Sequence, residues 1–142
     1  LEHDLKRIAS GSNDQYAAFD FFVTADSLVD WRWPEHPTNP SLDTEYRKIR
    51  RDVRKLQPLP RIAAHIANGA KHFVATRHDA IAGIEKARVC EEGVYETGVF
   101  YEPILVSLTP KEAIELCCQE SVEVEWLARK LLAYWRTRLN DS

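Results

Sequence analysis

Apolar side chains recur at helical spacing along most of the chain and predict a mainly α protein. The segment 14–33 is apolar on nearly all sides, and one continuous stripe is formed by Ala18, Phe19, Phe22, Ala25, Val29 and Trp33. A helix without a polar face is typical of the centre of a helical bundle. We therefore expect 14–33 to be the central helix, and the prolines at positions 34, 37 and 40 to end it in an extended loop.

The next predicted helix, at 44–57, is expected to lie on the surface with one buried edge. Asp43 precedes it as the expected N-cap. The apolar edge follows a 3–4–3 spacing at Tyr46, Ile49, Val53 and Leu56. The remaining positions are mostly basic, and a shorter helix is predicted upstream at 1–9.

A further helix is predicted at 60–80, with Pro60 in its first turn. Its inner face is expected to bury Ile62, Ile66, Gly69 and Phe73. Glycine in a helix interior lowers helix propensity by about 1 kcal/mol. Gly69 therefore predicts a close approach by another backbone, either the central helix or a second subunit.

The pattern changes after Gly83, where β-branched and aromatic residues are punctuated by glycines. We expect a β-hairpin excursion of two or three strands at 86–108. Helix resumes at Thr109-Pro110-Lys111-Glu112, which has the residues of a capping box with proline at the first position. A last helix is predicted from Ser121, with a buried stripe of Val124, Leu127, Leu131, Tyr134 and Trp135.

These elements predict one domain, 1–142, built as a helical bundle with a small inserted β-hairpin. The 142 residues, 44% hydrophobic and 29% charged, suffice for a sizeable core in a soluble globular protein. No apolar run is long enough to cross a membrane, and no signal peptide is visible. The expected main core consists of Phe19, Phe22, Val29, Ile62, Ile66, Phe73, Leu127 and Leu131.

The three cysteines are an odd number, and Cys117 and Cys118 are adjacent. Neighbouring cysteines rarely form a disulfide together, and Cys90 has no obvious partner. We therefore expect a reduced, cytoplasmic protein with buried structural thiols. The spacing typical of a zinc site is absent.

The net charge of −3 conceals a strong asymmetry along the chain. Residues 44–78 carry nine basic and two acidic side chains, whereas residues 85–125 carry three basic side chains and ten glutamates. A basic segment suits a polyanion. The acidic segment would repel a polyanion or pair with the basic segment of a second copy.

The segment 61–78, RIAAHIANGAKHFVATRH, holds three of the five histidines and no carboxylate. At about 100° per residue, one helix face presents Arg61, His65, Asn68, His72 and Thr76 opposite the core. Four interpretations are open: a metal site, an RNA- or phosphate-binding face, acid–base catalysis by His72, and hydrogen bonding to neighbouring loops.

A metal site is the least favoured of these interpretations. His65 and His72 are two helical turns apart, about 10 Å, which is too far for one ion unless Asp26 and Asp30 supply carboxylates. A phosphate- or RNA-binding face is better supported, because Arg61, Lys71 and Arg77 add to the basic helix at 44–57.

In a helical bundle, the sequence IANGAKHF resembles the HEPN domains of bacterial defence and toxin systems. The resemblance implies a metal-independent ribonuclease whose motif, an arginine, a polar residue and a later histidine, is paired across a homodimer cleft. Asn68 matches the polar residue and His72 the histidine, but Ala67 stands in the arginine's place. That arginine is expected to stabilise charge on the reacting phosphate, so Arg61 or Lys71 would have to substitute.

A hairpin at 86–108 is not a usual HEPN feature, and the segments FFVTA and NGAKHF also resemble a related bacterial family without an assigned activity. The resulting hypothesis is an RNA- or phosphate-binding, dimeric HEPN-like domain, a degenerate ribonuclease without metal or cofactor. Its candidate catalytic residues are His72, Asn68 and Arg61. Its candidate nucleic-acid contacts are Arg47, Arg50, Arg54, Lys71 and Arg77. The alternative is a non-catalytic structural or protein-interaction module, such as a regulator or an antitoxin-like partner.

Overall fold

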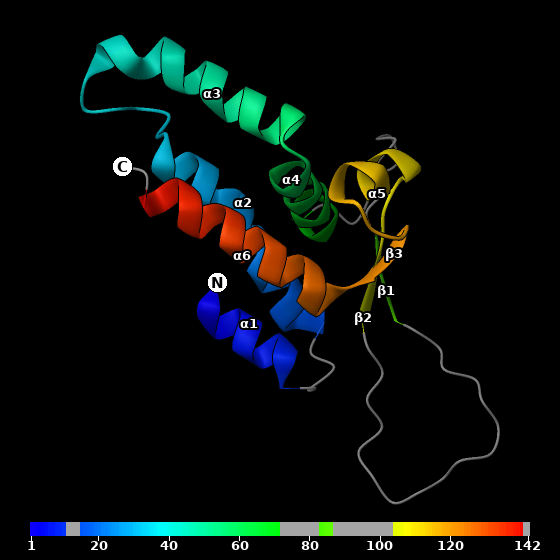
Figure 1. Ribbon diagram of the computed structural model, residues 1–142. Helices are drawn as coiled ribbons and strands as arrows, with labels where there is room; N and C mark the ends of the chain where they lie inside the picture. The colour runs from blue at the N-terminus through cyan, green and yellow to red at the C-terminus, as the bar shows by residue number, and fades with distance from the viewer. Residues whose placement is uncertain (11–14, 72–82, 87–103, 141–142) are drawn as a thin grey trace, which may run out of the picture.

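The computed structural model describes residues 1–10, 15–71, 83–86 and 104–140 (Figure 1). In these ranges six α-helices pack together with a small antiparallel sheet. The expected fold class, mainly α with an inserted β-hairpin, is thereby confirmed.

Helix α2 (Gln15–Arg32) is the centre of the bundle, as its lack of a polar face predicts. At about 100° per residue its buried apolar residues share one broad face, whereas Tyr16 and Trp31, outside that face, are 80% and 70% exposed. The buried residues are Ala17, Ala18, Phe21, Phe22, Ala25 and Val29. Four helices pack around it (Figure 1), namely α1 (Glu2–Ala9), α3 (Asp43–Leu56), α4 (Pro58–Lys71) and α6 (Val124–Asn140).

Six of the eight expected core residues are buried in one cluster: Phe22, Val29, Ile62, Ile66, Leu127 and Leu131. Phe19 is only half-buried at the edge of this cluster, and Phe73 lies outside the described residues. Phe21 is completely buried instead, with its ring 5.4 Å from that of Phe22 in an edge-to-face arrangement. Helices cover α2 on more than one side, so adjacent phenylalanines can both be buried.

Helix α3 differs from its sequence prediction at both ends. A short 3₁₀ turn, η1 (Pro40–Leu42), leads directly into it. Asp43 is therefore the first helical residue and not the N-cap, and its carboxylate accepts a hydrogen bond from Arg47 at 3.1 Å. At the other end Leu56 is 68% exposed, because α3 stops there and Gln57 turns into an extended conformation. Val53 is the buried residue of the expected edge.

No other part of the described chain packs closely against Gly69 of α4. A β-carbon added to Gly69 would meet nothing within 4 Å. The expected contact with the central helix is therefore wrong. The core covers α4 as far as Ile66 and Ala67, and Gly69 lies beyond it, exposed in the last turn.

Two antiparallel strands, β1 (Gly83–Lys86) and β2 (Ile104–Ser107), pair at the ends of the predicted hairpin. Strand β1 begins before the expected start at 86, and residues 87–103 of the prediction lie outside the described residues. The register pairs Gly83 with Ser107 and Lys86 with Ile104. A third strand, β3 (Ser121–Glu123), pairs with the other edge of β2. Helix α6 therefore begins at Val124, and the expected helix start at Ser121 is wrong, because the backbone of 121–123 is hydrogen-bonded to β2.

Helix α5 (Pro110–Leu116) is short and has a defined cap at each end. The predicted capping box is confirmed, because the Glu112 N–H donates to Thr109 Oγ1 at 2.9 Å and the Thr109 N–H donates to Glu112 Oε2 at 3.1 Å. At its end Cys117 adopts the left-handed conformation, with φ 52° and ψ 47°. The Cys118 N–H closes the turn by donating to the Ala113 carbonyl at 2.9 Å.

Truncation of Phe22 to alanine should lower the free energy of unfolding by about 3–5 kcal/mol, because the ring is fully buried. The same change at half-buried Phe19 should cost about 1–2 kcal/mol, because less apolar area is lost. Urea denaturation of both variants measures the difference. Equal losses would contradict the burial described for these two rings.

Candidate functional site

Helix α4 presents the polar face that its spacing predicts. Arg61 and His65 are half-buried and Asn68 is exposed, while Ile62 and Ile66 are buried on the opposite side. Lys71 is the last residue of α4. The remaining predicted site residues on this segment, His72 and Arg77, lie outside the described residues.

Ala67, the residue that the expected resemblance to HEPN domains sets in place of an arginine, faces the core. It is 0% exposed, so it does not share the accessible side of α4 with His65 and Asn68. An arginine function on this face would have to come from another position, and Arg61 is the basic residue of α4 whose side chain is described.

Arg61 is held by two carboxylates of α5. Its Nη2 group donates to Glu115 Oε2, and its Nε atom lies 3.8 Å from Glu112 Oε1. His65 Nδ1 is 3.9 Å from the same Glu112 oxygen. The Glu112 side chain is only 4% exposed, so the cluster is shielded from water at Glu112, whereas Glu115 lies at the surface. The arrangement neutralises Arg61 and fastens α4 to α5.

Two of the three arginines predicted on α3 are likewise engaged within the fold. Arg54 Nε donates to Asp26 Oδ1 at 2.9 Å, and its Nη2 donates to Asp30 Oδ2 at 2.8 Å. Burial works to lower the pKa of Arg54, but the hydrogen bonds to Asp30 and Asp26 outweigh it and raise this pKa above its ordinary value. Arg50 Nη1 donates to the Trp33 carbonyl at 2.8 Å. These contacts fasten α3 to the C-terminal end of α2.

The opposite side of α3 carries four basic side chains that are exposed to solvent: Arg47, Lys48, Arg51 and Lys55. We call this set the outer basic face. At about 100° per residue the four positions fall within a sector of about 100°, and α3 lies at the periphery of the bundle (Figure 1). Sequence reasoning named Arg47 and missed the other three, although their spacing of one, three and four residues signals a single helix face.

The outer basic face has few acidic neighbours. Asp43 pairs with Arg47 at 3.1 Å and Asp52 with Arg51 at 3.4 Å, all four on exposed or half-buried side chains. Ion pairs of this kind contribute little, because water and salt screen them. The structure records no ion pair for Lys48 or Lys55 among the described residues. The face therefore offers four cations to a ligand.

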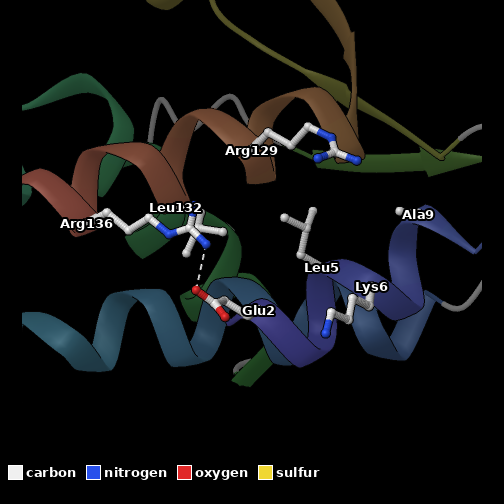
Figure 2. Close-up of a pocket in the computed structure, with 7 residues that line it drawn as sticks. All are labelled: Glu2, Leu5, Lys6, Ala9, Arg129, Leu132 and Arg136. Atoms are coloured by element: carbon white, nitrogen blue, oxygen red, sulfur yellow. Dashed lines mark hydrogen bonds and ion pairs between the residues drawn. The ribbon is translucent and has the colours of Figure 1, made fainter.

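A small pocket of about 210 Å³ lies between α1 and α6, where Leu5 and Leu132 supply apolar surface and Lys6, Arg129 and Arg136 supply charge (Figure 2). Arg136 reaches across to Glu2, with 2.6 Å between Nη2 and Oε1, and this hydrogen bond lowers the pKa of Glu2. Arg129 is paired with Glu125 at 2.6 Å. Both arginines are thus paired with glutamates. The Arg136–Glu2 pair links α6 to α1, so these charges are better suited to stabilising the fold than to catalysis.

The described cysteines are not the buried thiols that were expected. Cys117 is exposed and Cys118 half-buried, both as free thiols, because they follow the last turn of α5 at the surface. Burial, with a smaller contribution from Cys117, raises the pKa of the Cys118 thiol. Cys90 lies outside the described residues. Within the described ranges, no three or more histidine, cysteine or acidic residues are grouped to hold a metal ion.

Comparison of the chain with known protein families, with curated proteins and with solved structures finds no match. No helix in the described part of the chain is long and apolar enough to span a membrane. The observations that define the protein are therefore its helical bundle, its small sheet and the charge arrangement of α3 and α4.

Replacing Asp26 with alanine should destabilise the protein by about 1–3 kcal/mol, because it leaves Arg54 without its more buried partner. The matched change at Asp30, whose side chain is 54% exposed, should cost less than about 1 kcal/mol. Urea denaturation of the single variants and of each double variant with Arg54→Met gives both coupling energies. A larger coupling to Asp30 than to Asp26 would contradict this account.

Proposed function

We propose that this protein is a non-catalytic helical module that binds RNA through the outer basic face of α3. The proposal rests on one observation: some basic residues of this helix contact α2, and the others are exposed to solvent. Arg50 and Arg54 anchor α3 to α2, and the four exposed basic side chains then face away from the bundle. Such a stripe of like charge on one rigid element suits a phosphate backbone.

The energetics of such binding are those of counterion release. If four basic side chains each neutralise one phosphate of a single strand, the logarithm of the binding constant should fall with the logarithm of salt concentration with a slope of about −3. Between 50 and 200 mM salt this slope corresponds to a loss of affinity of about 50-fold. Binding of this kind does not depend strongly on sequence.

The state of the α4 face supports the non-catalytic part of the proposal. Arg61, the nearest substitute for the missing motif arginine, is already neutralised by Glu112 and Glu115. A cation that is paired in this way stabilises developing charge on a phosphate poorly, because its own partners compete for it. The α4–α5 cluster is thus better suited to holding the fold together.

A second candidate is a metal-independent ribonuclease of the HEPN type that acts as a homodimer. It is favoured by the accessible polar face of α4, on which Arg61, His65 and Asn68 lie together. In this candidate His72 transfers a proton and Asn68 orients the substrate, while Lys71 and Arg77 add to the attraction for RNA. The two candidates differ in whether RNA is cut.

Binding of a fluorescein-labelled single-stranded RNA, measured by anisotropy at 50 and 200 mM salt, tests the first candidate. The double variant Lys48→Glu/Lys55→Glu should lower the affinity by at least tenfold at low salt, because two phosphate contacts become repulsive. The matched control is Lys111→Glu/Lys130→Glu, which changes the net charge equally on α5 and α6. Equal losses in both variants, or no salt-dependent binding by the unaltered protein, would contradict the proposal and favour a protein-interaction module.

Cleavage of the same RNA in the presence of EDTA tests the second candidate. His72→Ala should abolish cleavage and leave the affinity within about twofold, because its role is proton transfer and not attraction. RNA that stays intact with the unaltered protein would exclude this candidate and leave the non-catalytic module.

A further inference from the structure

Two adjacent thiols open onto a depression of about 410 Å³ at the end of α5. Cys117, Cys118 and Gln119 line it together with Ser121, Val122 and Glu123 of β3 and Trp126 of α6. The site lies away from α3 and shares no residue with the outer basic face. It contains the only two cysteines in the described part of the chain.

The turn that carries the two thiols is firmly hydrogen-bonded. The Cys117 N–H donates to the Ile114 carbonyl at 3.1 Å, and the Cys118 N–H donates to the Ala113 carbonyl at 2.9 Å. Cys117 takes the left-handed position that glycine most often occupies after a helix. The backbone therefore holds two neighbouring sulfur side chains at the surface in a defined turn.

The two thiols are poorly suited to form a disulfide with each other. Consecutive α-carbons are about 3.8 Å apart across a trans peptide, and disulfides usually need about 4.4 Å or more. The chain contains no cis peptide bond among its described residues. A metal ion bound between the two sulfurs avoids this restriction, because the sulfurs are then farther apart than in a direct S–S bond.

The lining of the depression favours a soft cation over other thiol chemistry. Among the described residues no lysine, arginine or histidine lines it, so none of these stabilises the free thiolate that a nucleophile or redox centre needs. Lys130 is engaged with the ring of Trp126, 5.5 Å from its centroid. Glu123 adds negative charge. Sulfur ligands prefer Cu⁺ and Zn²⁺, but zinc requires about four protein ligands in a structural site, and the described residues group fewer than three.

We propose that Cys117 and Cys118 together bind one Cu⁺ ion, with Glu123 at the rim of the site. Two sulfur–copper bonds form as the two S–H protons leave to solvent, and the copper stays in the +1 state, so no oxidant or reductant is consumed. This inference is independent of RNA binding.

The experiment titrates the reduced, full-length protein with Cu⁺ under anaerobic conditions, in competition with the chromophoric chelator bicinchoninate. We expect one ion per chain. The key variant is Cys117→Gly, because glycine suits the left-handed position and should keep the melting temperature at least as high as that of the unaltered protein. Its affinity for Cu⁺ should nevertheless fall by more than about 100-fold, which exceeds the loss expected for a residue outside the ligand shell.

Two further variants complete the test. Cys118→Ser should lose affinity to the same extent as Cys117→Gly, whereas Cys90→Ser, the matched control for a thiol elsewhere in the chain, should leave affinity and stoichiometry unchanged. A Cys117→Gly variant that is folded and still binds Cu⁺ as tightly would overturn the proposal. Equal losses in all three variants, or a stoichiometry above one, would also overturn it, because binding would then be a general property of the thiols.

Discussion

The structure depends on the need to cover the broad apolar face of α2. This face carries two phenylalanines, three alanines and a valine that are buried, and leaving them in water would forfeit the main favourable contribution to folding. Four helices pack around it for this reason. Asp26 is buried in the same helix, so the covering layer must also supply a positive charge. Arg54 meets that requirement, and it thereby sets the position of α3.

Contacts within the fold neutralise part of the charge asymmetry of the chain. Arg54 and Arg50 of the basic segment are bound to α2, and Arg61 is bound to Glu112 and Glu115 of the acidic segment. The first set of contacts joins α3 to the end of α2, and the second joins α4 to α5 across 54 residues of the chain. The basic side chains on the outer side of α3 take no part in them. The functional hypothesis therefore moves from the α4 face, where the sequence motif lies, to the outer basic face of α3.

Local capping signals at the two ends of α5 position Glu112 and the two thiols. Seven residues make a helix too short to be stable alone. The capping box at Thr109 satisfies the Glu112 N–H in its first turn, and the turn at Cys117 satisfies the Ala113 and Ile114 carbonyls. Glu112 serves both the cap and the cluster with Arg61, so it joins local and tertiary structure. The same turn brings the two thiols to the surface beside β3 and α6.

The sequence by itself determined the features that depend on neighbouring residues. Helical periodicity identified the helices and the central place of α2, and the capping box at Thr109 was visible because its partners are three residues apart. The tertiary structure decided what depends on contacts across the chain. Ser121 joined a strand because β2 lay beside it, and Gly69 stayed exposed because no described element covers it. Whether an arginine is free to bind a ligand was also decided there. Arg51 and Arg54 look alike in the sequence, but only Arg54 faces the buried carboxylate of Asp26. Arg54 and Asp26 are 28 residues apart in the chain, which is beyond the reach of any local pattern.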